Sequence, residues 1–189
     1  QFHLSANGQN SQGHTCFGFP GEGRRYAWRV RACNSSCSEF SAWTDLLISI
    51  THSGPFCAAA CGPARIKFLG IDIEKAEPRA AAWYTDYFHK SELPSHDMEA
   101  ATRLWTRKEA LLKALGLGLK ADPLDINLAG GAPEFSRTAL ARYIELGSPA
   151  FTLNTLVRGD TLQQGVPPGY YLSTACENAG AASGPAAAP

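Results

Sequence analysis

Two carboxylates in the stretch "GIDIE" are the first residues of this sequence that could do chemistry. They are Asp72 and Glu74, and on a β-strand they share one face while Ile71 and Ile73 face the other side. Neighbouring carboxylates repel each other unless a positive charge lies between them. A hard cation such as Mg²⁺ supplies that charge, because it binds carboxylate oxygens together with phosphate oxygens and water. The alternative is a solvent-facing strand edge where Lys75 offsets the charge.

The stretch "WTRKEALLKALGLGL", residues 105–119, adds a third carboxylate and two ammonium groups. Glu109 and Lys113 are four residues apart and share one face of a helix, with Lys108 adjacent and Trp105 one turn earlier. One interpretation is a surface Glu–Lys pair that stabilises the helix by roughly a few tenths of a kcal/mol. The other is a metal ligand accompanied by two phosphate ligands. Taken alone, the helix leaves both open.

A third stretch, "ISITHSGPF", ends an apolar strand with Thr51, His52 and Ser53. Hydroxyl groups, an imidazole and the amides of a turn can together hold a phosphate. A Ser–His nucleophile pair is disfavoured, because adjacent residues of an extended strand point to opposite faces. Phosphate binding is therefore the preferred functional interpretation.

The order of these stretches resembles the signature of the 4′-phosphopantetheinyl transferases, specifically the broad-range surfactin-synthetase-activating type. That family shows a Ser-His-Ser/Thr stretch, then G-[IV]-D-[IV]-E, then W-x-x-K-E-x-x-x-K with a trailing G-x-G-L. The matching segments here are 51–53, 70–74 and 105–119, and "FHKSEL" at 88–93 is similar to an intervening helix with Glu92 at its acidic position. The resemblance covers residues 45–130 well and extends more weakly to "PGYYLSTAC".

The resemblance implies an enzyme that uses coenzyme A and Mg²⁺ (or Mn²⁺). Such enzymes transfer the phosphopantetheine arm of coenzyme A to a serine of an acyl or peptidyl carrier protein. The products are the holo carrier protein and adenosine 3′,5′-bisphosphate. The implied pathways are fatty-acid, polyketide or nonribosomal-peptide biosynthesis, and the implied location is the cytoplasm.

The resemblance also assigns roles to the charged residues of the two later stretches. Asp72, Glu74 and Glu109 would hold the metal against the pyrophosphate. Glu109 would also be the general base for the serine hydroxyl, directly or through a water. Lys113 would neutralise or protonate the leaving phosphate, and Lys108 would clamp the pyrophosphate.

At the adenosine end, His52 would hold the 3′-phosphate of the coenzyme with help from Thr51 and Ser53. Thr51 stands where the family usually has serine, and it keeps the hydroxyl. Four arginines near the N-terminus could also reach the 3′-phosphate, the alternative being a solvated strand face. They are Arg24, Arg25, Arg29 and Arg31.

Composition excludes several other classes of protein. The 189 residues include 17 Lys and Arg and 17 Asp and Glu, so a zero net charge argues against sequence-independent binding of nucleic acid. No apolar run reaches the roughly 18–20 residues of a membrane span, so we expect no membrane partner. The six cysteines are expected to be small buried thiols, with metal binding or disulfides as the alternatives.

The elements that must position these residues predict an α+β fold with a largely antiparallel sheet. Strands are expected at 24–33, on both sides of a turn at 53–55, and at 66–74. Helices are expected at 79–93, stopped by Pro94, and from about 97 to 115, capped by glycine. Further strands are expected at 125–130, 141–146, 150–157 and 169–176.

The expected organisation is a shortened, partly loop-like N-terminal half at 1–62, a half with the motifs at 63–177 and a flexible tail at 178–189. The resemblance implies a pseudo-dimer of two halves, here incomplete. Excision from a multidomain polyketide or fatty acid synthase would explain the short first half. The start at Gln1 rather than Met suggests this explanation. A neighbouring subunit of a homo-oligomer could also complete the cleft.

Two alternatives to an active transferase stay open. One is a non-catalytic module of a synthase that binds coenzyme A or a carrier protein. The other is an unrelated α+β domain in which the motifs are coincidental. The presence of all five charged motif residues argues against the module, because a decayed domain would be expected to have lost at least one.

Overall fold

The computed structural model describes residues 2–4, 26–32, 44–62, 66–156 and 166–178. These residues form two larger antiparallel sheets, a two-stranded antiparallel sheet and a helical layer, which confirms the predicted α+β class. Arg24 and Arg25 lie outside the described residues, and for Arg29 and Arg31 only the strand that contains them is described. The described part of the chain contains no helix with the length and apolar character needed to cross a membrane.

The first sheet has the strand order β1-β2-β3-β4. Its strands are β1 (Phe2–Leu4), β2 (Tyr26–Ala32), β3 (Thr44–Ser53) and β4 (Phe56–Gly62). The tight turn between β3 and β4 places Gly54 at a φ of 55°, a left-handed conformation that glycine adopts without strain. The strands predicted around this turn are confirmed, and Thr51, His52 and Ser53 end β3.

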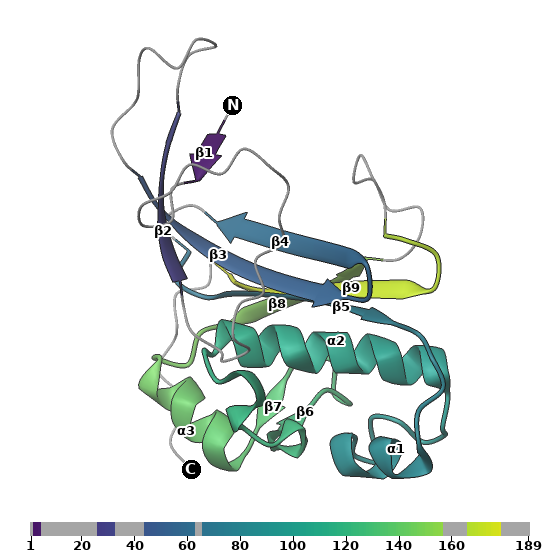
Figure 1. Ribbon diagram of the computed structural model, residues 1–189. Helices are drawn as coiled ribbons and strands as arrows, with labels where there is room; N and C mark the ends of the chain where they lie inside the picture. Colours follow the sequence, from purple (N-terminus) through teal and green to yellow (C-terminus); the bar gives the residue numbers. More distant parts are fainter. Residues whose placement is uncertain (1, 5–25, 33–43, 63–65, 157–165, 179–189) are drawn as a thin grey trace.

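The second sheet has the order β5-β9-β8 and lies between the β3–β4 hairpin and the helices (Figure 1). Its strands are β5 (Leu69–Lys75), β8 (Phe151–Leu156) and β9 (Tyr170–Glu177), each predicted from the sequence. Asp72 lies opposite Ser173 of β9. Because β5 is at the edge of this sheet, its outer backbone amides face β3 rather than a partner strand.

Helix α2 (Met98–Ala114) lies along the three-stranded sheet, close to the predicted bounds. The Asp97 side chain caps it by accepting a hydrogen bond from the amide of Ala100 at 2.8 Å. Gly116, at a φ of 72°, follows the end of the helix. At Gly70 of β5 the helix approaches so closely that an added Cβ would overlap the carbonyl oxygen of Ala110.

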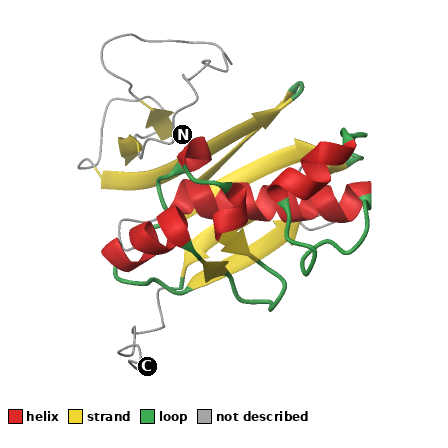
Figure 2. Ribbon diagram, turned by 90° about the horizontal axis from the view of Figure 1, so that it is seen from below, coloured by secondary structure: helices red, strands yellow, loops and turns green. Residues whose placement is uncertain are grey.

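The remaining elements lie on the far side of α2 from the sheet (Figure 2). They are α1 (Ala81–Tyr87), the 3-10 turns η1 (Gly118–Lys120) and η2 (Pro123–Asp125), the short strands β6 (Ile126–Asn127) and β7 (Glu134–Phe135), and α3 (Arg137–Glu145). A buried apolar cluster joins α2 to this layer and extends to β9 of the three-stranded sheet. It comprises Ala110, Leu111, Leu112, Ala114, Leu115, Ala121, Ile126, Leu128, Ala139 and Ala175.

Three predicted elements need correction. The segment 141–146 is not a strand but lies in α3, because Ala139, Tyr143 and Leu146 pack against the apolar cluster at a helical spacing. The strand predicted at 125–130 contracts to the two residues of β6. The helix predicted at 79–93 ends at Tyr87, and the residues that follow turn back toward α2.

Candidate active site

Asp72 is the most buried carboxylate of the predicted site, with 4% of its surface exposed. Its Oδ1 accepts hydrogen bonds from Thr51 Oγ1 at 2.8 Å and from Lys113 Nζ at 2.7 Å. Its Oδ2 is also buried and has no hydrogen-bond partner among the described residues. Burial raises the pKa of Asp72 above its usual value, although the Lys113 ammonium opposes this.

Glu74 follows on the same face of β5 and is half-buried. Its Oε2 accepts a hydrogen bond from Ser53 Oγ at 3.3 Å and lies 3.8 Å from the Arg79 guanidinium. Burial, and then the negative charge of Asp72, raises the pKa of Glu74. The two carboxylates therefore repel each other, as their spacing on a strand predicts.

Glu109 approaches these carboxylates from α2. Its side chain is buried, and its pKa rises to about 7 because of burial first and the negative charge of Asp72 second. Glu74 raises this pKa further, and the Lys113 ammonium lowers it. The structure thus brings Asp72, Glu74 and Glu109 from two elements into one electrostatic environment.

Lys113 supplies the positive charge at this site. Its Nζ donates to Asp72 Oδ1 at 2.7 Å and to the Ile71 carbonyl oxygen at 3.1 Å, and its side chain is 24% exposed. An ammonium group has three hydrogens to donate. Two are used on the protein, so one remains for an incoming phosphate oxygen.

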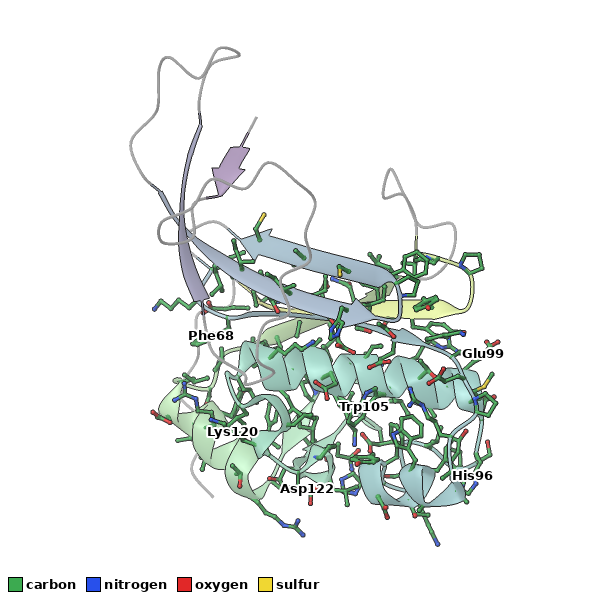
Figure 3. The ribbon with its side chains drawn as sticks, viewed as in Figure 1. Phe68, His96, Glu99, Trp105, Lys120 and Asp122 are labelled. Atoms are coloured by element: carbon green, nitrogen blue, oxygen red, sulfur yellow. The ribbon has the colours of Figure 1, made fainter. Side chains whose placement is uncertain are left out.

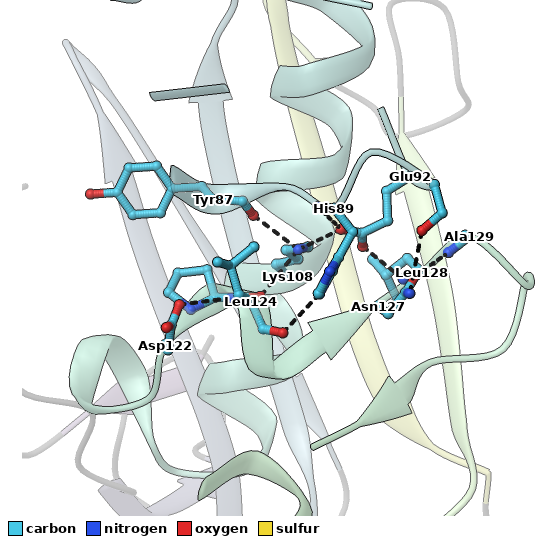
Figure 4. Close-up of polar contacts among 11 residues, drawn as sticks. Tyr87, His89, Glu92, Lys108, Asp122, Leu124, Asn127, Leu128 and Ala129 are labelled. Atoms are coloured by element: carbon cyan, nitrogen blue, oxygen red, sulfur yellow. Dashed lines mark hydrogen bonds and ion pairs between the residues drawn. The ribbon is translucent and has the colours of Figure 1, made fainter. Parts of the chain in front are cut away.

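Lys108 does not join this group, which corrects its predicted role as a pyrophosphate clamp. The side chain is 0% exposed, and its Nζ donates to the Tyr87 and Pro123 carbonyl oxygens and to Glu92 Oε2, at 2.9, 3.1 and 2.8 Å (Figure 4). All three hydrogens are used on protein atoms. The ammonium also lies 5.4 Å from the centre of the Phe88 ring. The contacts of Lys108 therefore leave no donor for a phosphate.

Glu92 completes a buried network with Lys108. Its Oε2 also accepts from the His89 amide at 2.9 Å, and its Oε1 accepts from the Leu128 amide at 2.7 Å (Figure 4). His89 Nε2 donates to the Leu124 carbonyl oxygen at 2.8 Å. The network joins α2 to the segments after α1 and around η2, so Lys108 holds the fold together beneath the site.

The residues of the Thr-His-Ser stretch lie on two faces of β3. Thr51 and Ser53 face β5, where their hydroxyls donate to Asp72 and Glu74. His52 is exposed on the opposite face. The structure therefore separates the imidazole from the two hydroxyls that were predicted to hold the same phosphate. Of these three residues, only His52 is exposed.

Comparison with known proteins finds a family match for the region that contains the three carboxylates and Lys113. Residues 68–152 match the model of the 4′-phosphopantetheinyl transferase superfamily. This part of the chain is similar to that superfamily. The matched region includes all three carboxylates and Lys113, and the family predicted from the sequence is confirmed.

A curated phosphopantetheinyl transferase gives a second match. It is the L-aminoadipate-semialdehyde dehydrogenase-phosphopantetheinyl transferase of Schizosaccharomyces pombe, which is 41% identical over 123 residues. The match covers 43% of this chain and 47% of the relative. The chain thus spans about half the length of this relative. The narrower surfactin-synthetase-activating type stays a prediction.

In the region that matches the superfamily, the chemistry of the donor set fits a hard divalent cation. All three side chains offer carboxylate oxygens, and the buried Asp72 Oδ2 has no partner among the described residues. Within the same part of the chain, however, no three His, Cys, Asp or Glu side chains form a ready-made metal cluster. Lys113 contacts Asp72 instead, so the carboxylates would have to draw closer to hold a cation.

The motif tryptophan, Trp105, packs against α1 rather than on the carboxylates. Its ring centre lies 6.0 Å from that of Trp83 and 5.1 Å from that of Tyr87. Figure 3 shows Trp105 among the side chains that lie between α2 and α1. Trp105 therefore fixes α1 against α2, one helical turn before Glu109.

Two of the cysteines differ from their predicted burial. Cys57 and Cys61 are exposed on β4, and Cys176 on β9 is half-buried. The other three, Cys16, Cys33 and Cys37, lie outside the described residues. The prediction of small buried thiols is therefore wrong for Cys57 and Cys61.

Proposed function

We propose that this chain transfers the phosphopantetheine arm of coenzyme A to a serine of a carrier protein. The observation that carries the proposal is the convergence of Asp72, Glu74 and Glu109 with Lys113, inside the region matched to the superfamily. The serine oxygen forms a bond to the β-phosphorus, and the bond from that phosphorus to the bridging oxygen breaks. The products are a holo carrier protein and adenosine 3′,5′-bisphosphate.

Asp72, Glu74 and Glu109 would hold Mg²⁺ or Mn²⁺. The bound cation would offset the charge of the pyrophosphate during transfer. Glu109 would accept the proton of the serine hydroxyl, and a pKa of about 7 suits a general base at neutral pH. The remaining hydrogen of Lys113 would be directed to the leaving phosphate, where it offsets the charge that develops.

The adenosine end of the coenzyme would lie toward the exposed face of β3. His52 is exposed there and would contact the 3′-phosphate. Arg24 and Arg25 stay candidates for the same phosphate on the basis of the family resemblance alone. We leave Lys108, Thr51 and Ser53 out of the coenzyme site, because their polar groups are engaged with the protein.

The acceptor would be an acyl or peptidyl carrier protein. The name of the fission yeast relative couples phosphopantetheinyl transfer to L-aminoadipate-semialdehyde dehydrogenase. A carrier region of that kind of enzyme is therefore the first acceptor to test. Carrier proteins of fatty-acid, polyketide and nonribosomal-peptide synthesis are the next.

Intact-mass measurement of apo carrier proteins tests the proposal. The chain is incubated with each carrier, coenzyme A and Mg²⁺, and with EDTA in place of Mg²⁺ as the control. We expect the mass of one phosphopantetheine on at least one carrier, and none in EDTA. No gain on any carrier would overturn the proposal. Calorimetric binding of coenzyme A without transfer would then indicate the non-catalytic module.

A further inference from the structure

Three hydroxyls of β3 take the place of a partner strand along the edge of β5. Their oxygens accept hydrogen bonds from alternate backbone amides of β5 at 3.1 to 3.3 Å. The pairs are Ser49 with the Ile71 amide, Thr51 with the Ile73 amide and Ser53 with the Lys75 amide. An edge strand otherwise leaves such amides unpaired, and a buried unpaired amide is costly. The hydroxyls thus join the two sheets.

Two of these hydroxyls use their single hydrogen on a carboxylate. Thr51 Oγ1 donates to Asp72 Oδ1 at 2.8 Å, and Ser53 Oγ donates to Glu74 Oε2 at 3.3 Å. Each hydroxyl therefore links a backbone amide to the carboxylate of the preceding residue. Ser49 makes the same amide contact, but the residue that precedes its partner amide is Gly70, which has no carboxylate.

The geometry at Asp72 decides which oxygen is available. Thr51 and Lys113 both bind Oδ1, which fixes the rotation of the carboxylate. The other oxygen, Oδ2, is buried without a hydrogen-bond partner among the described residues. A buried oxygen without a partner is costly in isolation, and a cation would satisfy it.

We propose that Thr51, assisted by Ser53, is a positioning residue that orients the carboxylates of Asp72 and Glu74 for a divalent cation. This inference rests on the proposed function for the identity of the cation. Thr51 is 6% exposed, and its one hydrogen is used on Asp72, so it has no free donor for the coenzyme. Groups that orient metal ligands typically change metal affinity about 10- to 100-fold when they are removed.

The test compares Thr51→Val, Thr51→Ser and Ser49→Ala in the full chain. Thr51→Val keeps the shape but loses the hydroxyl, Thr51→Ser keeps the hydroxyl, and Ser49→Ala loses an amide contact with no carboxylate attached. Mg²⁺ affinity is measured by calorimetry in the presence of coenzyme A. We expect Thr51→Val to weaken Mg²⁺ binding about 10-fold or more, and Thr51→Ser and Ser49→Ala to bind as the parent does.

Kinetics with two co-substrates separate this role from a coenzyme contact. We expect Thr51→Val to need more Mg²⁺, while the KM for coenzyme A at saturating Mg²⁺ stays unchanged. If Thr51 held the 3′-phosphate instead, Thr51→Val would raise the KM for coenzyme A but not for dephospho-coenzyme A, which lacks that phosphate. That result, or parental Mg²⁺ affinity in Thr51→Val, would overturn the proposal.

Failure of the positioning role and failure of the proposed function give different results. A parent that binds Mg²⁺ but transfers nothing would overturn the function, while the calorimetric comparison would still decide the role of Thr51. A parent that binds no Mg²⁺ would overturn the positioning role. If Thr51→Val does not fold, Ser53→Ala replaces it, because Ser53 is only half-buried and its substitution disturbs the fold less. Ser53→Ala is also expected to weaken Mg²⁺ binding.

Discussion

Glu109 combines burial with two neighbouring negative charges, and its pKa of about 7 follows from that environment. In the absence of metal, the folded chain keeps a proton on this carboxyl at pH values where the unfolded chain has lost it. Proton uptake then favours the folded state. The free energy of unfolding must therefore fall as the pH rises from the usual value of 4.5 to about 7.

The pH dependence of the free energy of unfolding tests whether the pKa of Glu109 is raised. We expect the EDTA-treated parent to lose on the order of 2 to 3 kcal/mol of stability between about pH 5 and pH 8 through this group. Glu109→Gln, which has no proton to lose, should show a correspondingly flatter profile in denaturant titrations. Equal slopes for the two proteins would show that Glu109 has an ordinary pKa.

Lys108 tests the distinction between a structural charge and a phosphate ligand. We expect Lys108→Met to lose about 3 to 5 kcal/mol of stability, because Glu92 is left buried without its counter-charge. The double variant Lys108→Met/Glu92→Gln should recover much of this loss in thermal melting. Its KM for coenzyme A should equal that of the parent below the melting temperature. A stable Lys108→Met with a raised KM for coenzyme A would restore the pyrophosphate role.

At the level of elements, the contact between β5 and α2 sets the distance between the carboxylates of the two elements. Gly70 allows this contact, because any Cβ there would overlap the backbone of Ala110. Asp72 is two residues further along β5, and Glu109 precedes Ala110 on α2. The glycine of "GIDIE" therefore belongs to the site through packing rather than through chemistry.

We expect Gly70→Ala to destabilise the chain by about 1 to 3 kcal/mol or more, since the clash involves backbone atoms. At about 2 to 4 °C per kcal/mol, thermal melting would detect this change. Gly130→Ala is the matched control, because its Cβ would meet only the Glu134 side chain at 3.7 Å. Equal melting temperatures for the two variants would contradict the close approach of β5 and α2.

Most strands and the long helix could be predicted from the sequence, but α3 could not. The segment 141–146 was predicted to be a strand, whereas its apolar contacts begin earlier, at Ala139, and follow a helical spacing. The early end of α1 was also missed. The residues after Tyr87 turn so that Glu92 can reach Lys108, and a pairing over 16 residues leaves no local signal.

The site was predictable as far as its carboxylates, because two short motifs contain them. Ser49 was missed, although Ser49, Thr51 and Ser53 recur every second residue, as one face of a strand requires. The pattern alone does not show that β5 lies beside β3 and donates its backbone amides to these hydroxyls. The burial of Lys108 was equally hidden, since lysine is almost never fully buried unless it is paired.

At the level of the whole molecule, the site lies where the β3–β4 hairpin, the three-stranded sheet and α2 meet (Figure 1). Each contributes one part: the orienting hydroxyls, two carboxylates, and a third carboxylate with its ammonium partner. The division of the chain at residues 62 and 177, the cytoplasmic location and a homo-oligomeric state stay predictions.

The rate of carrier modification as a function of Mg²⁺ concentration, for the parent and for Glu109→Gln, tests the central claim most directly. Formation of holo carrier protein would be followed by intact mass, with thermal melting to confirm that the variant is folded. We predict a saturable dependence on Mg²⁺ for the parent and a loss of at least about 100-fold in rate for the variant. Transfer that is independent of Mg²⁺, or a folded Glu109→Gln as active as the parent, would contradict the account.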